Sequence, residues 1–205
     1  MHSKSKLVFR KGFGSSFVSL RPSAVLVGKR PDIHEDLFHL ALCRQHLRGL
    51  TNSVDRVVSM HPLAVLNPLE MKRLETYVKL WYGMEHMNKC SWENLAVCLS
   101  DEPNGGWVTW SGISSAIPTL RRSSGLIASP SAHRVFLLKE LFASMGFASF
   151  QHLADTARVP LYEVHKPLLG LKYSHMRQAL GNAQHVGNVG VFGLCALACV
   201  SKRHV

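Results

Sequence analysis

Residues 117–147 have the sequence IPTLRRSSGLIASPSAHRVFLLKELFASMGF, in which three segments of different character follow one another. The segment 118–122 predicts a short extended piece that ends in two arginines. The segment 123–130 is rich in Ser and Gly, which is typical of a loop. Residues 134–145 carry apolar side chains at helical spacing and stop before Gly146, so they predict a helix.

The motifs PTL, S-x-G-L-I, R-V-F-L-L-K-E-L and M-G-F in this stretch resemble the ninth conserved block of the cytosine-C5 DNA methyltransferases. In that family the block supports the DNA-recognition lobe and joins it to the catalytic lobe. The resemblance matches Arg134 and Glu140 to the arginine and glutamate of the block. It implies that Arg134 pairs with a carboxylate or with backbone carbonyls at the lobe junction. Leu137 replaces the family's threonine, which removes a helix cap, and Ala148 stands where the family has the proline of G-F-P.

A second resemblance lies near the C-terminus, where residues 177–183 read RQALGNA before an apolar segment at 186–200 that predicts a helix. This order resembles the tenth block of the same family, whose G-N turn lines the pocket of S-adenosylmethionine. The resemblance therefore implies that Gly181 and Asn182 lie on the cofactor side. The alternative is a tight turn at the start of a helix, with no ligand. The resemblance covers residues 117–200 and is thin before them.

The family's catalytic residues are missing from the sequence. Its nucleophile is a cysteine in P-C-Q that attacks a flipped cytosine, and none of the five cysteines here follows a proline. No Gly-rich cofactor turn follows a strand, and Glu93-Asn94-Leu95 resembles the family's E-N-V motif in the wrong order along the chain. We assign no catalytic residue and predict that this chain alone does not transfer methyl groups. Most of the pocket that S-adenosylmethionine occupies in the family is absent.

The chain is strongly basic, with 24 Lys and Arg against 13 Asp and Glu and a net charge of +11 over 205 residues. This charge favours a polyanionic partner, and DNA is the first expectation. A basic protein that binds no nucleic acid is an equal alternative on composition, and RNA stays open. The predicted DNA contacts are Arg121 and Arg122, beside the Ser/Gly loop, and Arg21, which matches one arginine of the family's eighth block. The alternative is that Arg121 and Arg122 are a solvated pair and that Arg21 is a surface arginine without a DNA contact.

Three regions are expected: a flexible basic arm at 1–16, a recognition-like region at 17–115, and the two methyltransferase blocks at 116–205. An organelle transit peptide is the alternative for the arm. The middle region predicts helices near 33–48 and 68–82.

Local signals supply the boundaries of these elements. Asp32 is the expected N-cap of the first helix, and the second begins with an Asn cap at Asn67, Pro68 at its first position and Glu70 at its third. Short strands are expected at 23–30 and 107–110.

The fold class expected from these elements is α+β: a small mixed helical domain with a few short strands and a C-terminal apolar helix. It corresponds to part of a methyltransferase fold without most of the cofactor-binding sheet. The apolar run at 189–200 spans only 12 residues, which favours a buried helix over a membrane span. His39, Cys43 and His46 are spaced along one helix face, but no fourth ligand accompanies them, so we predict no metal site. The cysteines are expected to be reduced, in the nucleus or the cytoplasm.

Three functional hypotheses follow. The first is a truncated or split methyltransferase-like protein that retains a DNA-contacting surface. The second is a non-catalytic module that binds DNA or a partner chain, where the partner supplies the catalytic lobe. The third is the tail fragment of an active methyltransferase.

Overall fold

The computed structural model describes residues 21–44, 47, 59–84, 88–105, 108–121, 125–164, 173–182 and 189. Within these residues the chain forms six α-helices, two short 3₁₀ helices and one three-stranded sheet, so the expected α+β class is confirmed. In chain order the elements are α2 (Pro22–Val25), α3 (Arg30–Leu42), η2 (Pro62–Val65), α5 (Pro68–Gly83), η3 (Trp92–Asn94), β1 (Val97–Cys98), β2 (Ile127–Ser129), β3 (Arg134–Val135), α6 (Leu138–Ser144), α7 (Gln151–Ala157) and α8 (Tyr173–Asn182).

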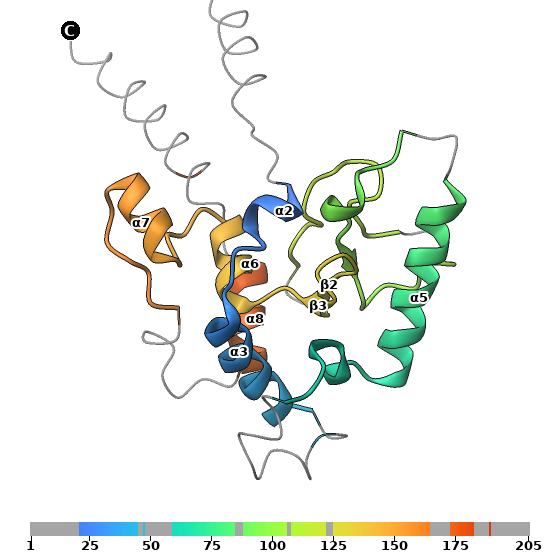
Figure 1. Ribbon diagram of the computed structural model, residues 1–205, viewed down its shortest axis with the longest axis horizontal. Coiled ribbons are helices and arrows are strands. Elements are labelled where there is room, and N and C mark those ends of the chain that lie inside the picture. Colours follow the sequence, from blue (N-terminus) through green and yellow to red (C-terminus); the bar gives the residue numbers. More distant parts are fainter. Residues whose placement is uncertain are drawn as a thin grey trace, which may run out of the picture.

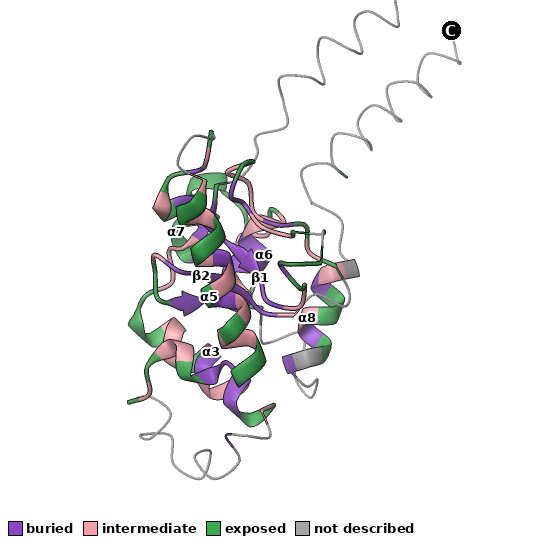
Figure 2. Ribbon diagram, turned by 90° about the vertical axis from the view of Figure 1, so that its right-hand side faces the viewer, coloured by how far each residue is buried: buried purple, intermediate pink, exposed green. Residues whose placement is uncertain are grey.

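The sheet lies at the centre of the molecule, between α5 on one side and α3, α6 and α8 on the other (Figure 1). Its strands are antiparallel in the order β1-β2-β3, with Val97 opposite Ala128 and Ala128 opposite Val135. All strand residues are buried, and Figure 2 shows the strands in purple, whereas α5 carries many exposed residues in green. The strands come from both sides of residue 115, so one sheet joins the regions expected at 17–115 and 116–205.

The start of α5 follows the sequence signal. The Asn67 side chain accepts a 2.9 Å hydrogen bond from the Glu70 N–H, and the Glu70 carboxylate accepts one of 2.9 Å from the Asn67 N–H. Pro68 occupies the first turn, where its missing N–H costs no helical hydrogen bond. The helix then runs to Gly83 and buries Leu74 and Tyr77 against the sheet side. The prediction of a helix near 68–82 is confirmed.

The end of α6 is also set locally. Gly146 has a φ of 87°, a left-handed conformation that glycine adopts without a Cβ penalty. The N–H groups of Gly146 and Phe147 donate to the carbonyls of Ala143 and Phe142, which is the hydrogen-bond pattern of a Schellman cap. The Phe147 ring packs edge-on against Phe142 at 5.3 Å. The predicted stop at Gly146 is therefore correct.

The beginning of this helix was predicted wrongly. The sequence placed Arg134 inside a helix from 134 to 145, but Arg134 and Val135 form β3 and α6 starts only at Leu138. Residues six apart on one helix lie on different faces. A turn between Arg134 and Glu140 allows the two side chains to meet.

Two further segments differ from the sequence prediction. The loop expected at 123–130 contains β2, because Leu126 and Ile127 are buried between the other two strands. The strand expected at 23–30 is replaced by α2 and an irregular connection. There the Gly28 N–H donates to a side chain and not to a neighbouring strand.

The helix predicted at 33–48 is shifted toward the N-terminus. It begins after Lys29, and Asp32, the expected N-cap, is the third helical residue, whose carboxylate accepts the Lys29 N–H. Pro31 fits this first turn for the same reason as Pro68. The helix ends at Leu42 and not at residue 48, and Arg44 beyond it forms a two-pronged ion pair with Glu70.

The remaining expectations are met in part. The strand expected at 107–110 is reduced to a single bridge between Trp110 and Val97. The expected arm at 1–16 lies outside the described residues, as does the helix expected at 186–200 apart from Val189. No helix in the described ranges is both long enough and apolar enough to cross a membrane.

Candidate functional site

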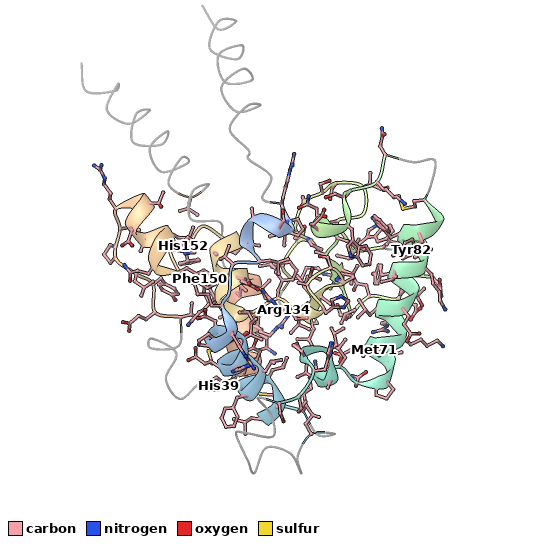
Figure 3. All side chains as sticks on the ribbon, in the orientation of Figure 1. His39, Met71, Tyr82, Arg134, Phe150 and His152 are labelled. Atoms are coloured by element: carbon pink, nitrogen blue, oxygen red, sulfur yellow. The ribbon has the colours of Figure 1, made fainter. Side chains whose placement is uncertain are left out.

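Arg134 of β3 and Glu140 of α6 form a buried ion pair (Figure 3 labels Arg134). The guanidinium donates to both carboxylate oxygens, with Nη1–Oε2 at 2.7 Å and Nη2–Oε1 at 2.6 Å. The side chain of Arg134 is 7% exposed and that of Glu140 is 0% exposed. Nη1 also donates to the carbonyl of Val135 at 3.1 Å. Such a two-pronged pair fixes the turn between β3 and α6.

The Glu140 carboxylate also holds the backbone on both sides of the pair. Oε2 accepts the N–H of Leu137 at 2.9 Å, and Oε1 accepts the N–H of Gly28 at 2.9 Å. Every oxygen of this buried carboxylate therefore has two donors, as a buried charge requires. The contact with Gly28 joins the segment before α3 to the start of α6 across 112 residues of sequence.

Gly28 is needed for this close approach. A Cβ built on it would overlap Cδ1 of Leu137 and lie 3.1 Å from Oε1 of Glu140. Any side chain at this position would push the connection away from the carboxylate that its N–H reaches. The backbone of Gly28 and the ion pair therefore form one unit.

Asp36, on α3, provides the cap that α6 lacks. Leu137 occupies the N-cap position of α6 and has no polar side-chain atom. Instead Oδ2 of Asp36 accepts the N–H of Leu138 at 2.6 Å and the hydroxyl of Tyr173 at 2.8 Å. Asp36 is 4% exposed, and this burial raises the pKa of its carboxyl to about 6, although the two hydrogen bonds act in the opposite direction.

Helix α8 contacts this site through its first turns. Tyr173 is buried, and its burial together with the neighbouring Asp36 charge raises the pKa of its hydroxyl well above the ordinary value. Arg177, one turn along, donates from Nη2 to the carbonyl of Gly125 at 2.7 Å, while its buried Nη1 has no hydrogen-bond partner among the residues that the structure describes. Met176 and Leu180 complete the buried face of α8.

Gly181 and Asn182 do not form the tight turn that the sequence predicted. Both belong to the last turn of α8, because the helix continues through them. At this end of a helix the unsatisfied groups are carbonyls and not N–H donors. Within the described residues, this pair therefore presents no tight turn of N–H groups. A cofactor role for the two residues remains a prediction.

The predicted DNA contacts lie elsewhere. Arg121 binds Asp101 through Nη2, at 2.7 and 2.6 Å from the two carboxylate oxygens, and its side chain is 47% exposed. Partial burial acts to raise the pKa of Asp101, but hydrogen bonds led by that from Arg121 outweigh it and lower the pKa. Arg21 is exposed at the N-cap of α2. Arg122 lies outside the described residues. The structure does not bring Arg21 and Arg121 into contact with the buried junction.

The positive charge of the chain is unevenly distributed. The described residues hold 13 of the 24 Lys and Arg and 11 of the 13 Asp and Glu, so they account for about +2 of the net +11. Several of these cations are already in ion pairs with carboxylates: Arg44, Arg73, Arg121, Arg134 and Lys139. The described ranges also contain no group of three His, Cys, Asp or Glu that could hold a metal ion. Most of the charge surplus lies in the segments outside these ranges.

Sequence reasoning named Arg134 and Glu140 but missed Asp36 and Tyr173. The signal for Asp36 was present, since a carboxylate one turn before Leu40 sits on the apolar face of its helix. Nothing local marked Tyr173 as its partner. No known protein family, curated protein or solved structure matches the chain.

Proposed function

We propose that the chain is a cytosine-C5 DNA methyltransferase-like protein that binds DNA and does not transfer methyl groups by itself. The observation that supports this most is the meeting of the two resembling blocks. α6 carries part of the ninth block and α8 part of the tenth, and Arg177 of α8 donates to the carbonyl of Gly125 in the S-x-G-L-I motif at 2.7 Å. The buried pair of Arg134 and Glu140 uses the two charged residues that the ninth block supplies. In this proposal they are structural residues at the lobe junction.

The proposal excludes methyl transfer by this chain alone for a chemical reason. Attack on cytosine C6 needs a thiolate placed beside a flipped base. No cysteine of the chain stands in the P-C-Q context, and Cys90 and Cys98 are buried. S-adenosylmethionine would supply the methyl group in the family. Transfer would therefore require a partner chain that contributes the nucleophile and the cofactor pocket.

DNA binding in this proposal depends on the basic segments more than on the folded core. The core is close to neutral, whereas residues 1–16 contain Lys4, Lys6, Arg10 and Lys11 and no acid. Phosphate contacts made by such residues release counterions, so affinity falls with the logarithm of salt concentration. Arg21, Arg121 and Arg122 are the proposed contacts nearer the core.

The test is the salt dependence of duplex DNA binding, measured by fluorescence anisotropy with the full chain. We expect the logarithm of affinity to fall linearly with the logarithm of salt. Replacing Lys4, Lys6, Arg10 and Lys11 with Ala should reduce the slope by about 3 to 4 if each contacts a phosphate. Lys72→Gln, on the exposed side of α5, is the control and should change the slope by less than about 1. An affinity that does not respond to salt would exclude the proposal that the basic segments bind DNA. Methyl transfer to DNA by the purified chain would exclude the proposal that this chain alone is inactive.

A further inference from the structure

Three aromatic side chains cluster where α5 ends and η3 begins. The ring of Tyr82 lies 5.2 Å from Trp81 and 5.8 Å from Trp92, and the rings of Trp81 and Trp92 are 5.0 Å apart. We call Trp81, Tyr82 and Trp92 the aromatic platform. Figure 3 shows Tyr82 near the C-terminal end of α5, on the opposite side of the molecule from His152 of α7.

The aromatic platform differs from a core cluster in its exposure. Tyr77, one turn earlier on α5, is fully buried, whereas Tyr82 is 58% exposed and Trp81 and Trp92 are half-buried. A residue whose role is to seal the sheet would be covered as Tyr77 is. An exposed ring held at a 34° tilt to a second ring leaves an aromatic face in contact with solvent.

The platform is held in place by backbone contacts. The indole N–H of Trp81 donates to the carbonyl of Cys90 at 3.2 Å, and the N–H of Cys90 donates to the carbonyl of Gly112 at 2.7 Å. The hydroxyl of Ser23, near the N-terminal end of α2, donates to the side chain of Asn94 at 2.7 Å and so fixes η3. The rings therefore lose little further freedom when a flat ligand stacks on them.

A cation lies beside this surface. The Lys89 ammonium is 4.1 Å from the centre of the Trp81 ring and donates to the Trp81 carbonyl at 3.4 Å. Lys79 is exposed one turn before Tyr82 on α5. Glu93 is exposed next to Trp92, and its negative charge repels an anion there. A phosphate is therefore attracted to the Lys89 side of the aromatic platform. Exposed aromatic rings beside a cation are the arrangement by which proteins stack unpaired bases along a backbone of phosphates.

We propose that the aromatic platform binds an unpaired base of single-stranded nucleic acid by stacking on Tyr82, with Lys89 beside the adjoining phosphate. This goes beyond the proposed function, which concerns duplex DNA and the basic segments. The stacked base needs no particular sequence, because every base has an aromatic face. The platform would hold a strand opened near the protein.

The test compares the binding of an oligothymidylate and of duplex DNA by full-length variants. Tyr82→Ala should weaken oligothymidylate binding by about fivefold or more, whereas Tyr82→Phe, which keeps the ring, should stay within about twofold. Leu69→Ala is the matched control, since Leu69 is 52% exposed near the other end of α5, and it should have no effect. Tyr82→Ala should leave duplex binding unchanged.

A second variant tests the same site without removing a ring. Glu93→Gln should tighten oligothymidylate binding by roughly twofold at low salt, as expected for an exposed charge. Equal oligothymidylate affinity of the wild type and Tyr82→Ala overturns the inference, and so does an equal loss in Tyr82→Phe. If the duplex binds with its salt dependence and the oligothymidylate does not bind, only this inference fails. If neither binds, the proposed function fails as well.

Discussion

The hydroxyl of Tyr173 donates a 2.8 Å hydrogen bond to the carboxylate of Asp36, which stands 137 residues earlier in the chain. The same carboxylate oxygen accepts the N–H of Leu138. One buried side chain on α3 thus holds the first turn of α6 and the first residue of α8. Four predictions follow from this site and its surroundings.

The stability of the protein should depend on the protonation of Asp36. Because its folded-state pKa of about 6 lies above the ordinary value of 3.8, the folded state binds this proton more tightly than the unfolded state. Its contribution is fully favourable below pH 4 and is lost as pH rises through 6, a difference of about 3 kcal/mol. Asp36→Asn should remove this dependence. Urea unfolding at pH 4 and pH 8 measures it.

The comparison that isolates Asp36 is the difference in free energy of unfolding between the wild type and Asp36→Asn at each pH. Asp32 and Asp101, whose pKa values are lowered, act below pH 4. A pH-independent difference between the two proteins would contradict the role of Asp36.

The Arg134–Glu140 pair should show strong coupling between its two members. Arg134→Met leaves the Glu140 carboxylate buried without its counter-charge and should reduce the free energy of unfolding by about 3–5 kcal/mol. Combining it with Glu140→Gln should recover part of this loss. The neutral amide oxygen can still accept a backbone N–H, and no unpaired charge remains buried.

A double-mutant cycle by urea unfolding measures this coupling. The two single variants and the double variant complete the cycle with the wild type. Strictly additive effects would show that the pair does not act as a unit, in spite of its geometry.

Gly28→Ala should destabilise the protein by about 1–3 kcal/mol, because the added methyl group overlaps Leu137. Gly83→Ala, at the end of α5, is the control, since a Cβ there meets no atom within 4 Å. The control should be neutral or slightly stabilising. Thermal unfolding of both variants checks the difference. Equal melting temperatures would mean that the connection before α3 can shift to accommodate the methyl group with no loss of stability.

Asp101→Asn should strengthen duplex DNA binding at low salt by roughly twofold to fivefold, since it removes the negative charge that Arg121 now binds. Arg121→Gln should abolish this gain when the two substitutions are combined. Anisotropy titrations at low and high salt separate a charge effect from a structural one. If Asp101→Asn still strengthens DNA binding when Arg121 is replaced, the gain comes from the general loss of a negative charge and not from Arg121.

The sequence predicted those features that are decided within a few residues. The cap at Asn67 and the stop at Gly146 each depend on neighbours within one turn, and both were predicted correctly. The start of α6 was not, because it depends on a carboxylate that binds Arg134 and the distant Gly28 together. A pattern of apolar spacing carries no information about such partners.

The same limit applies to the site. Arg134 and Glu140 were named from a resemblance, which preserves the residues of a contact made by the fold. Asp36 and Tyr173 belong to no motif, and their meeting depends on how α3 and α8 pack. Gly181 and Asn182 were expected in a turn because of the resemblance to the G-N turn of the tenth block, but both lie in α8.

The location of the α6 cap has a consequence for how the molecule is assembled. A helix capped by its own neighbour can begin to form alone, whereas α6 receives its acceptor from a helix 102 residues away. Its first turn therefore gains that hydrogen bond only after a long loop has closed, which places this contact late in folding. A polypeptide beginning after residue 59 would retain β1, β2, β3, α6 and α8. It would nevertheless lack the carboxylate that accepts the Leu138 N–H, so we expect its α6 to begin less firmly than in the whole chain.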